Sequence, residues 1–354
     1  MHNLLLYERL PISTTNFRKN ITWLAQDWQS SKKAVGGYWI ASFRLTQDRL
    51  TRGEIVDFYN QAIGWRVVEK SFGMTTWEGR ISNLTLAIDG AQYTRSLDPE
   101  NWHNRVAVRY PPTITDWAED ADSVALYGEN EYLDSVGGAY TETAAEARRD
   151  RRIAQYAYPR SRATGGLVAG EKPAVKLDVI CAGYAFTINQ RYRTTDTAAA
   201  AISIQLGDLI GESEFVTAGA IDTNSMSVPI SIEEVPRRLW DLIEELIGMG
   251  DESGNEWVGG VYAGRVFDYH LAETEVVYFW KNQKIYDASG APVLPTHIKA
   301  DTIVELVNAP RGQAGLGGSI PGRVYIDEVE FIAPSGYALT PRAGPLLIGE
   351  YQGE

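Results

Sequence analysis

Paired carboxylates are the first feature of this sequence that could perform chemistry. Two carboxyl groups on either side of a glycosidic bond can hydrolyse it, and ten tryptophans could stack against sugar rings. Acidic pairs are nevertheless common in acidic proteins, and tryptophans at alternating strand positions, such as Trp23 and Trp39, are expected in the core. We therefore expect no catalytic centre. The acidic cluster comprises Asp116, Glu119, Asp120 and Asp122, followed by Glu129 and Glu131.

The other signatures of catalysis and cofactor binding are incomplete. Gly317-Gly318-Ser319-Ile320-Pro321 has proline in place of the last glycine of a nucleophile elbow. Gly315-Leu316-Gly317 lacks the third glycine of a dinucleotide fingerprint, and there is no phosphate-binding Gly-Lys-Ser. The histidines are scattered, with none at metal-ligand spacing, so we expect no metal, no cofactor and no enzyme. The four histidines are His2, His103, His270 and His297.

An arginine-dense helix is the third chemical feature. Thr143-Ala144-Ala145-Glu146 predicts its start as a capping box, and Pro159 predicts its end, because proline disfavours helical geometry in the residue before it. Its apolar stripe is too narrow to form the centre of a core. The arginines could face solvent or contact an acidic neighbouring subunit. The candidate interface residues are Arg148, Arg149, Arg151 and Arg152 with Asp116, Glu119, Asp120 and Asp122.

The segments around this helix follow a particular order. A predicted strand ends in Tyr127-Gly128, and a loop, the helix, Tyr158-Pro159 and a β-rich continuation follow. Trp77 to Ile81, leading to Asn104 to Tyr110, and Val216 to Asn224 extend the same order. This order and spacing resembles the hub-type tail proteins of tailed phages, relatives of the baseplate hub and of the N-terminal part of tail-associated proteins.

The resemblance implies a structural virion protein at the tail tip, synthesised in the host cytoplasm. It implies a ring with a central channel for DNA. A homotrimer is the first choice for this ring, because two barrels per chain would present six units to a six-fold tail tube, and a hexamer is the second choice. The implied neighbours are the tail tube, the distal tail ring, and a fibre or spike. The alternatives are a carbohydrate-binding or carbohydrate-hydrolysing β-protein of the tail tip, a distal tail ring protein, and a cellular β-rich adaptor.

Length, composition and charge limit the possible classes. A chain of 354 residues can form two or three domains, and its 44% hydrophobic residues exclude disorder. No apolar run approaches the roughly 20 residues of a membrane span, and the start lacks the features of a secretory signal. One cysteine, Cys181, excludes an intramolecular disulfide. The formal charge of −13 argues against wrapping nucleic acid but suits a conduit through which DNA passes.

Hydrophobic periodicity predicts a mainly β (α+β) protein with two barrel-like β-domains and α/β connecting elements. We divide the chain into residues 1–112, a first barrel-like domain; 113–162, a connector with the polar helix; 163–225, a second β-unit; and 226–354, a C-terminal α+β region that completes the second barrel and ends in an extended tail. The predicted helices are 54–63, 143–158 and 236–248. The predicted strands are 3–10, 21–27, 38–45, 65–70, 74–88, 91–97, 105–110, 123–126, 176–192, 200–206, 257–269, 275–286, 302–307 and 323–332. Glycine-rich loops are predicted at 161–172 and 312–322.

Overall fold

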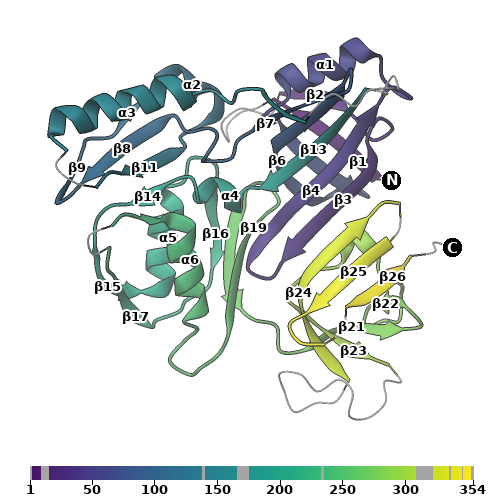
Figure 1. Ribbon diagram of the computed structural model, residues 1–354. Helices are drawn as coiled ribbons and strands as arrows, with labels where there is room; N and C mark the ends of the chain where they lie inside the picture. Colours follow the sequence, from purple (N-terminus) through teal and green to yellow (C-terminus); the bar gives the residue numbers. More distant parts are fainter. Residues whose placement is uncertain are drawn as a thin grey trace.

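Strands dominate the molecule (Figure 1). The computed structural model describes residues 2–8, 16–137, 140–165, 175–232, 235–307, 322–334, 336–344 and 346–351. The structure is 47% strand and 19% helix, which confirms the predicted mainly β class. It has four parts: a curled half-barrel, an α/β connector, a helical unit and a C-terminal β-unit.

The half-barrel is a curled antiparallel sheet built around one long strand. Its order is β2 (Phe17–Asn20), β1 (His2–Tyr7), β5 (Arg66–Ser71), β6 (Met74–Ile88), β13 (Lys176–Gly183), β4 (Gly36–Thr46) and β3 (Gln26–Lys33), each antiparallel to the next. Two strands, β7 (Ala91–Ser96) and β12 (Arg162–Gly165), extend a branch beside β6. Strand β13, from the segment predicted as a second β-unit, therefore lies in the middle of the first sheet.

A core of large side chains fills the half-barrel. Alternation along β4 places Phe43 inside and leaves Ile40 exposed, as a strand with one buried face requires. The rings of Trp28 and Trp77 meet edge to face at 5.9 Å near the centre. Helix α1 (Arg52–Gln61) begins at a capping box and packs its buried side chains into the same core.

A small α/β connector follows the half-barrel. Its sheet centres on β8 (Arg105–Tyr110), which is antiparallel to β9 (Thr113–Ile114) and β10 (Ala118–Glu119) and parallel to β11 (Glu131–Ser135). Two helices accompany the sheet, α2 (Ala121–Tyr127) and α3 (Glu142–Tyr156). Figure 1 shows α3 lying along β8 and β11, so this helix covers one face of the sheet.

The helical unit packs against a β-hairpin. The hairpin consists of β19 (Trp257–Tyr262) and β20 (Val266–Leu271), and β16 (Thr217–Ile221) runs parallel to β20. The helices are α4 (Ala185–Ile188), α5 (Ile202–Gly211) and α6 (Leu239–Gly248), flanked by the short pairs β14 (Tyr192–Arg193) with β18 (Arg237–Arg238) and β15 (Thr197–Ala201) with β17 (Ser227–Ile230). The apolar face predicted for α6 is buried, so this helix is confirmed as a core helix.

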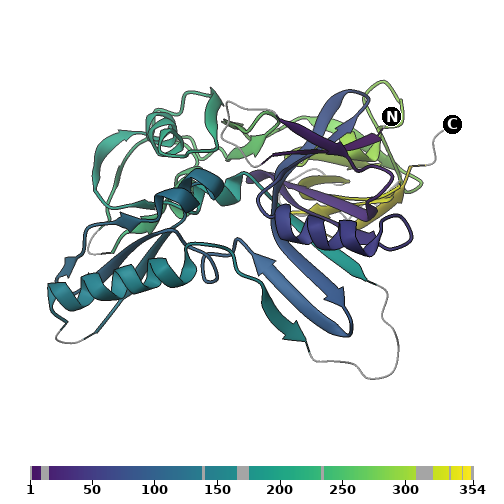
Figure 2. The ribbon, with the colours of Figure 1, turned by 90° about the horizontal axis from the view of Figure 1, so that it is seen from above.

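The C-terminal β-unit has its own core and shares a strand with the half-barrel. Its order is β22 (Lys284–Tyr286), β21 (Val276–Lys281), β23 (Thr302–Leu306), β24 (Arg323–Ile332), β25 (Gly336–Pro341) and β26 (Leu347–Glu350), and the 3-10 helix η1 (Pro295–His297) precedes β23. The second half of β24 also pairs with β3. Figures 1 and 2 place β1 and β26 on one side of the molecule, opposite α3.

Several predictions of local structure are wrong. Residues 123–126 form part of α2, because the Asp120 side chain caps that helix by accepting from Ser123 N at 2.9 Å. The apolar spacing after residue 201 is helical, so α5 replaces most of the strand predicted at 200–206 and Ile204 is exposed. Residues 22–24 form a turn, which leaves Trp23 62% exposed.

Other boundaries differ from the predictions. The strand predicted at 176–192 ends at Gly183, where α4 follows. The cap of the arginine helix lies two residues earlier than predicted, at Thr141 rather than Thr143, where the Thr141 side chain accepts from Ala144 N at 3.3 Å. Within the loop predicted at 161–172, residues 162–165 form β12. Residues 166–172 of that loop, and 312–321 of the second glycine-rich loop with its Gly-Ser motif, lie outside the described residues.

Candidate functional site

Two of the four candidate arginines hold α3 against its own sheet. Arg148 donates to Asp134 on β11 through Nε at 2.6 Å and Nη2 at 3.2 Å, and Arg152 Nε donates to the same carboxylate at 3.1 Å. Arg152 also lies over the ring of Tyr132 at 5.4 Å. The Asp134 side chain is 7% exposed, so these two arginines stabilise the packing of α3 on β11 within the connector.

We expect Asp134→Asn to destabilise the connector by about 2 kcal/mol at neutral pH, because two charge-assisted contacts are lost. Burial alone would raise the pKa of Asp134, but hydrogen bonds from Arg148 and the charge of Arg152 outweigh it and lower this pKa. The stabilisation is therefore present above the unfolded pKa of about 3.9 and is lost as pH falls through the lower folded value.

Urea unfolding of the parent protein and of the Asp134→Asn variant measures the difference in the free energy of unfolding. This difference should reach its full value at about pH 7 and be small below the folded pKa of Asp134. The matched control is Asp150→Asn on the same helix, whose side chain is 63% exposed. We expect the control to change stability by less than about 0.5 kcal/mol. Equal effects of the two substitutions at neutral pH would show that Asp134 does not anchor α3.

The other two candidate arginines are differently placed. Arg149 donates to Asp150 at 2.9 Å and to the main-chain oxygen of Asp116 at 3.1 Å. Arg151 is exposed and has no hydrogen-bond or ion-pair partner in the described part of the chain. The basic helix and the acidic segment thus already touch within one subunit, and Arg151 alone among the four remains free for an outside partner.

The acidic candidates divide in the same way. Asp120 caps α2 and also accepts from the Tyr158 hydroxyl at 3.2 Å. Glu119 lies 4.0 Å from Arg105 Nε. Asp116 and Asp122 are exposed, and neither carboxylate has a hydrogen-bond or ion-pair partner among the described residues. Of the eight candidate interface residues, those that are exposed and have no partner among the described residues are therefore Arg151, Asp116 and Asp122.

A buried ionic junction, which the sequence analysis missed, lies where the units meet. Glu78 on β6 accepts from Arg66 Nε at 2.8 Å and from Gly264 N at 2.9 Å, and Arg265 Nε lies 3.6 Å from the same carboxylate. Glu78 is 1% exposed and Arg265 is 3% exposed. Arg265 also lies over the ring of Tyr184 at 4.7 Å. One carboxylate therefore links the half-barrel to the β19–β20 turn of the helical unit.

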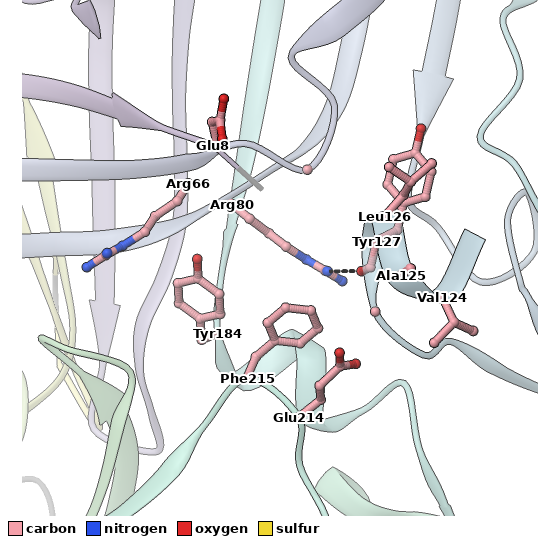
Figure 3. A pocket seen from close by; sticks show the side chains of 12 residues that line it. Glu8, Arg66, Arg80, Val124, Ala125, Leu126, Tyr127, Tyr184, Glu214 and Phe215 are labelled. Atoms are coloured by element: carbon pink, nitrogen blue, oxygen red, sulfur yellow. Dashed lines mark hydrogen bonds between the residues drawn. The ribbon is translucent and has the colours of Figure 1, made fainter. Parts of the chain in front are cut away.

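Arg80, two residues further along β6, joins this junction to the connector. Figure 3 shows its guanidinium reaching past Phe215 to the end of α2, where Nη1 donates to Tyr127 O at 3.3 Å. Burial lowers the pKa of Arg80 to about 10, although Tyr184 and Glu214 act in the opposite direction. The adjoining cavity has a volume of about 170 Å³. The only sequence signal was the presence of two charged residues between Trp77 and Ile81.

The described histidines and carboxylates form no metal-binding cluster. No group of three or more His, Cys, Asp or Glu that could hold a metal ion occurs among the described residues. The histidines are engaged separately: His2 contacts Glu69 at 2.8 Å, His103 stacks on Tyr132, and His270 lies 3.4 Å from Asp301. Among the described helices none is both long and apolar enough to cross a membrane.

Comparisons with known proteins find similarity to solved structures of two tail proteins and of a secretion-system component. The tail protein from Neisseria meningitidis MC58 has a TM-score of 0.43 and 6% identity, covering 99% of this chain and 97% of that one. The 43 kDa tail protein of prophage MuSo2 from Shewanella oneidensis has a TM-score of 0.44 and 8% identity, covering 98% and 96%.

A third similar structure is a component of the type VI secretion system of E. coli, described as structurally similar to the bacteriophage T4 tail proteins gp27 and gp5. It has a TM-score of 0.37 and 6% identity, covering 93% of this chain and 74% of that one. No family model and no curated protein matches the chain. The first two of these structures are described as tail proteins and the third as a secretion-system component.

Proposed function

We propose that the chain is a structural protein of a phage tail tip, a hub subunit that assembles into a ring with a central channel. A homotrimer is the first choice for this ring and a hexamer the second. The ring lies between the tail tube and the distal tail proteins, and DNA passes through its channel. The order of segments in the sequence supports this class. Two β-units joined through β24 support it further, since each can present a face to a neighbouring tail protein.

The observation that carries assembly into a ring is the set of unpaired charges at the connector end. Arg151 is exposed on α3, and Asp116 and Asp122 are exposed without partners in the described chain. In a cyclic oligomer, one patch meets a different patch on the next copy. Arg151 of one copy can therefore contact Asp116 or Asp122 of the next. The remaining arginines of the predicted interface keep α3 in place for this contact.

The experiment is a measurement of molar mass by light scattering at modest salt, followed by imaging of the purified oligomer. We expect a ring, and we expect Arg151→Glu to shift the protein towards monomer because exposed ion pairs become repulsive. The second change Asp122→Arg should restore assembly in part. Lys281→Glu, a matched charge reversal on the C-terminal unit, should have no effect. A protein that stays monomeric, or a ring indifferent to Arg151→Glu, would contradict the proposed interface.

A further inference from the structure

A small cavity lies where the half-barrel, the end of α2 and the helical unit meet (Figure 3). Its volume of about 170 Å³ is well above the roughly 10–15 Å³ that one water molecule needs. It is also below the roughly 300 Å³ at which sites for drug-sized ligands begin. The cavity can therefore hold several water molecules or one small organic molecule.

Two buried polar groups that line the cavity have hydrogen-bonding capacity that the chain leaves unused. Arg80 is 5% exposed, and of the several N–H donors of its guanidinium only Nη1 donates within the described chain, to Tyr127 O at 3.3 Å. Tyr184 is 3% exposed, and its hydroxyl has no hydrogen-bond partner among the described residues. Buried polar groups without partners are costly. A ligand that accepts hydrogen bonds from both groups would remove this cost.

The two carboxylates in the lining lie where solvent reaches them. Glu8 is half-buried and forms an ion pair with Arg18. Glu214 is exposed, and its carboxylate accepts from Glu129 N at 2.9 Å. Neither carboxylate lies within ion-pair distance of Arg80. Because solvent screens exposed charges more strongly than buried ones, Glu214 compensates the charge of Arg80 only in part.

The buried part of the cavity has more guanidinium groups than carboxylates. Arg66 Nε lies 2.8 Å from the buried Glu78, and Arg265 shares that carboxylate at 3.6 Å. Arg80 has no carboxylate partner in the described chain, so one positive charge is left over. The charged side chains of the lining, taken with their ion-pair partners, are the four arginines Arg18, Arg66, Arg80 and Arg265 and the three glutamates Glu8, Glu78 and Glu214.

Apolar side chains form another wall of the cavity. The Arg80 Cζ atom lies 5.3 Å from the centre of the Phe215 ring, and Val124 and Leu126 line the cavity from α2. These side chains could bury a short alkyl group next to the guanidinium. One surplus charge beside an apolar wall suits a monoanion that carries an alkyl group, whereas Glu214 would repel an inorganic dianion more strongly.

We propose that this cavity binds one carboxylate group attached to a short alkyl chain, with Arg80 and Tyr184 donating to the carboxylate oxygens. The group can belong to a free small molecule or to an acidic side chain of a neighbouring protein, since both offer the same chemistry. The proposal goes beyond assembly into a ring and does not depend on it, because neither Arg80 nor Tyr184 belongs to the proposed subunit contact.

Thermal unfolding of the full chain in sodium acetate at about pH 7, where acetate is ionised, tests the requirement for a carboxylate. The comparison solutions contain sodium chloride at equal ionic strength, sodium phosphate, or acetamide, which is the neutral isostere of acetate. A ligand that binds only the native state raises the unfolding midpoint as it saturates its site. We expect acetate to saturate with a dissociation constant on the order of 1 mM and phosphate to bind at least about tenfold more weakly. Acetamide and chloride should give no saturable shift.

A blocked peptide distinguishes the two sources of the carboxylate. In N-acetyl-Gly-Glu-Gly amide the glutamate side chain is the only carboxylate, and N-acetyl-Gly-Gln-Gly amide is its neutral control. A saturable shift with the glutamate peptide as well as with acetate would show that an acidic side chain of a partner can enter the cavity. A shift with acetate alone would restrict the site to free small molecules.

Two substitutions in the cavity test the proposed donors. Tyr184→Phe should weaken acetate binding about tenfold, and it should not lower the midpoint in chloride, because the lost hydroxyl has no partner. Arg80→Met should weaken acetate binding at least about thirtyfold. The matched controls outside the cavity are Tyr262→Phe and Arg160→Met, which should respond as the parent does. Arg160 donates to the main-chain oxygen of Ala154 at 3.2 Å and, like Arg80, has no carboxylate partner in the described chain.

The proposal is wrong if neither acetate nor the glutamate peptide gives a saturable shift beyond that of chloride, or if acetamide matches acetate. It is also wrong if Tyr184→Phe and Arg80→Met respond to acetate as the parent does. If Arg80→Met does not fold, the comparison of Tyr184→Phe with Tyr262→Phe decides alone. The ring measurement with Arg151→Glu is read separately, so the two proposals can fail independently.

Discussion

Replacing Glu78 with glutamine is expected to lower the free energy of unfolding by about 3–5 kcal/mol, because it leaves the buried Arg265 and the partly buried Arg66 without a counter-charge. Arg66 and Arg265 have no other ion-pair partner in the described chain, and Nη1 of Arg265 is already buried without a hydrogen bond. Glutamine keeps the size of the side chain but supplies no negative charge. The loss therefore falls on the contact between the half-barrel and the helical unit.

Urea unfolding followed by tryptophan fluorescence measures this effect. Glu146→Gln is the matched control, since Glu146 is exposed on α3 and has no partner among the described residues. We expect the control to change the free energy of unfolding by less than about 0.5 kcal/mol. If Glu78→Gln proved as mild as the control, the junction would not be what holds these units together.

Strand and helix positions were predictable where one short pattern decided them. The bounds of β8 and β24 match their predicted ranges. An apolar centre marks β8, and two alternating stretches, Val324 with Ile326 and Val329 with Phe331, mark β24. The same rule failed at residues 200–206, because Ile202, Ile204 and Leu206 alternate as in a strand over this short length. The buried apolar positions of the longer segment, 202, 206, 209 and 210, follow the helical period and leave Ile204 exposed. Burial in the core shared with α6 decided in favour of the helix.

The candidate site was predictable only in part, because its contacts join segments that lie far apart in the sequence. The arginine-rich face of α3 is visible in the sequence, but its partner Asp134 depends on the parallel pairing of β8 with β11. The contact between Glu78 and Gly264 joins residues 186 positions apart. A single sequence carries no record of such pairings, so the buried junction and the Arg80 cavity emerge only from the folded chain.

Replacing Gly260 with alanine is the second substitution for which we expect a large loss, about 3 kcal/mol. Gly260 lies on β19 at the point where this strand runs parallel to β4, in register with Gly36. A Cβ atom at Gly260 would lie 2.3 Å from the main-chain nitrogen of Gly37 and 2.7 Å from its Cα. Because these are main-chain atoms, no side-chain rotation can relieve the clash. The β19–β20 hairpin would have to move away from the half-barrel.

Gly207→Ala is the control for this prediction, because Gly207 lies within α5 and an added Cβ would meet no atom within 4 Å. Alanine there should stabilise the protein by about 0.5–1 kcal/mol, since glycine is the poorer helix former. Thermal unfolding of both variants gives the comparison, and hydrogen exchange at β19 and β4 locates the damage. Opposite signs for two chemically identical substitutions would assign the loss to the close approach of the two strands. A Gly260→Ala protein as stable as the parent would mean that the hairpin and the half-barrel can separate by the width of a methyl group at little cost. The buried contacts of Glu78 would then be the principal link between the two units.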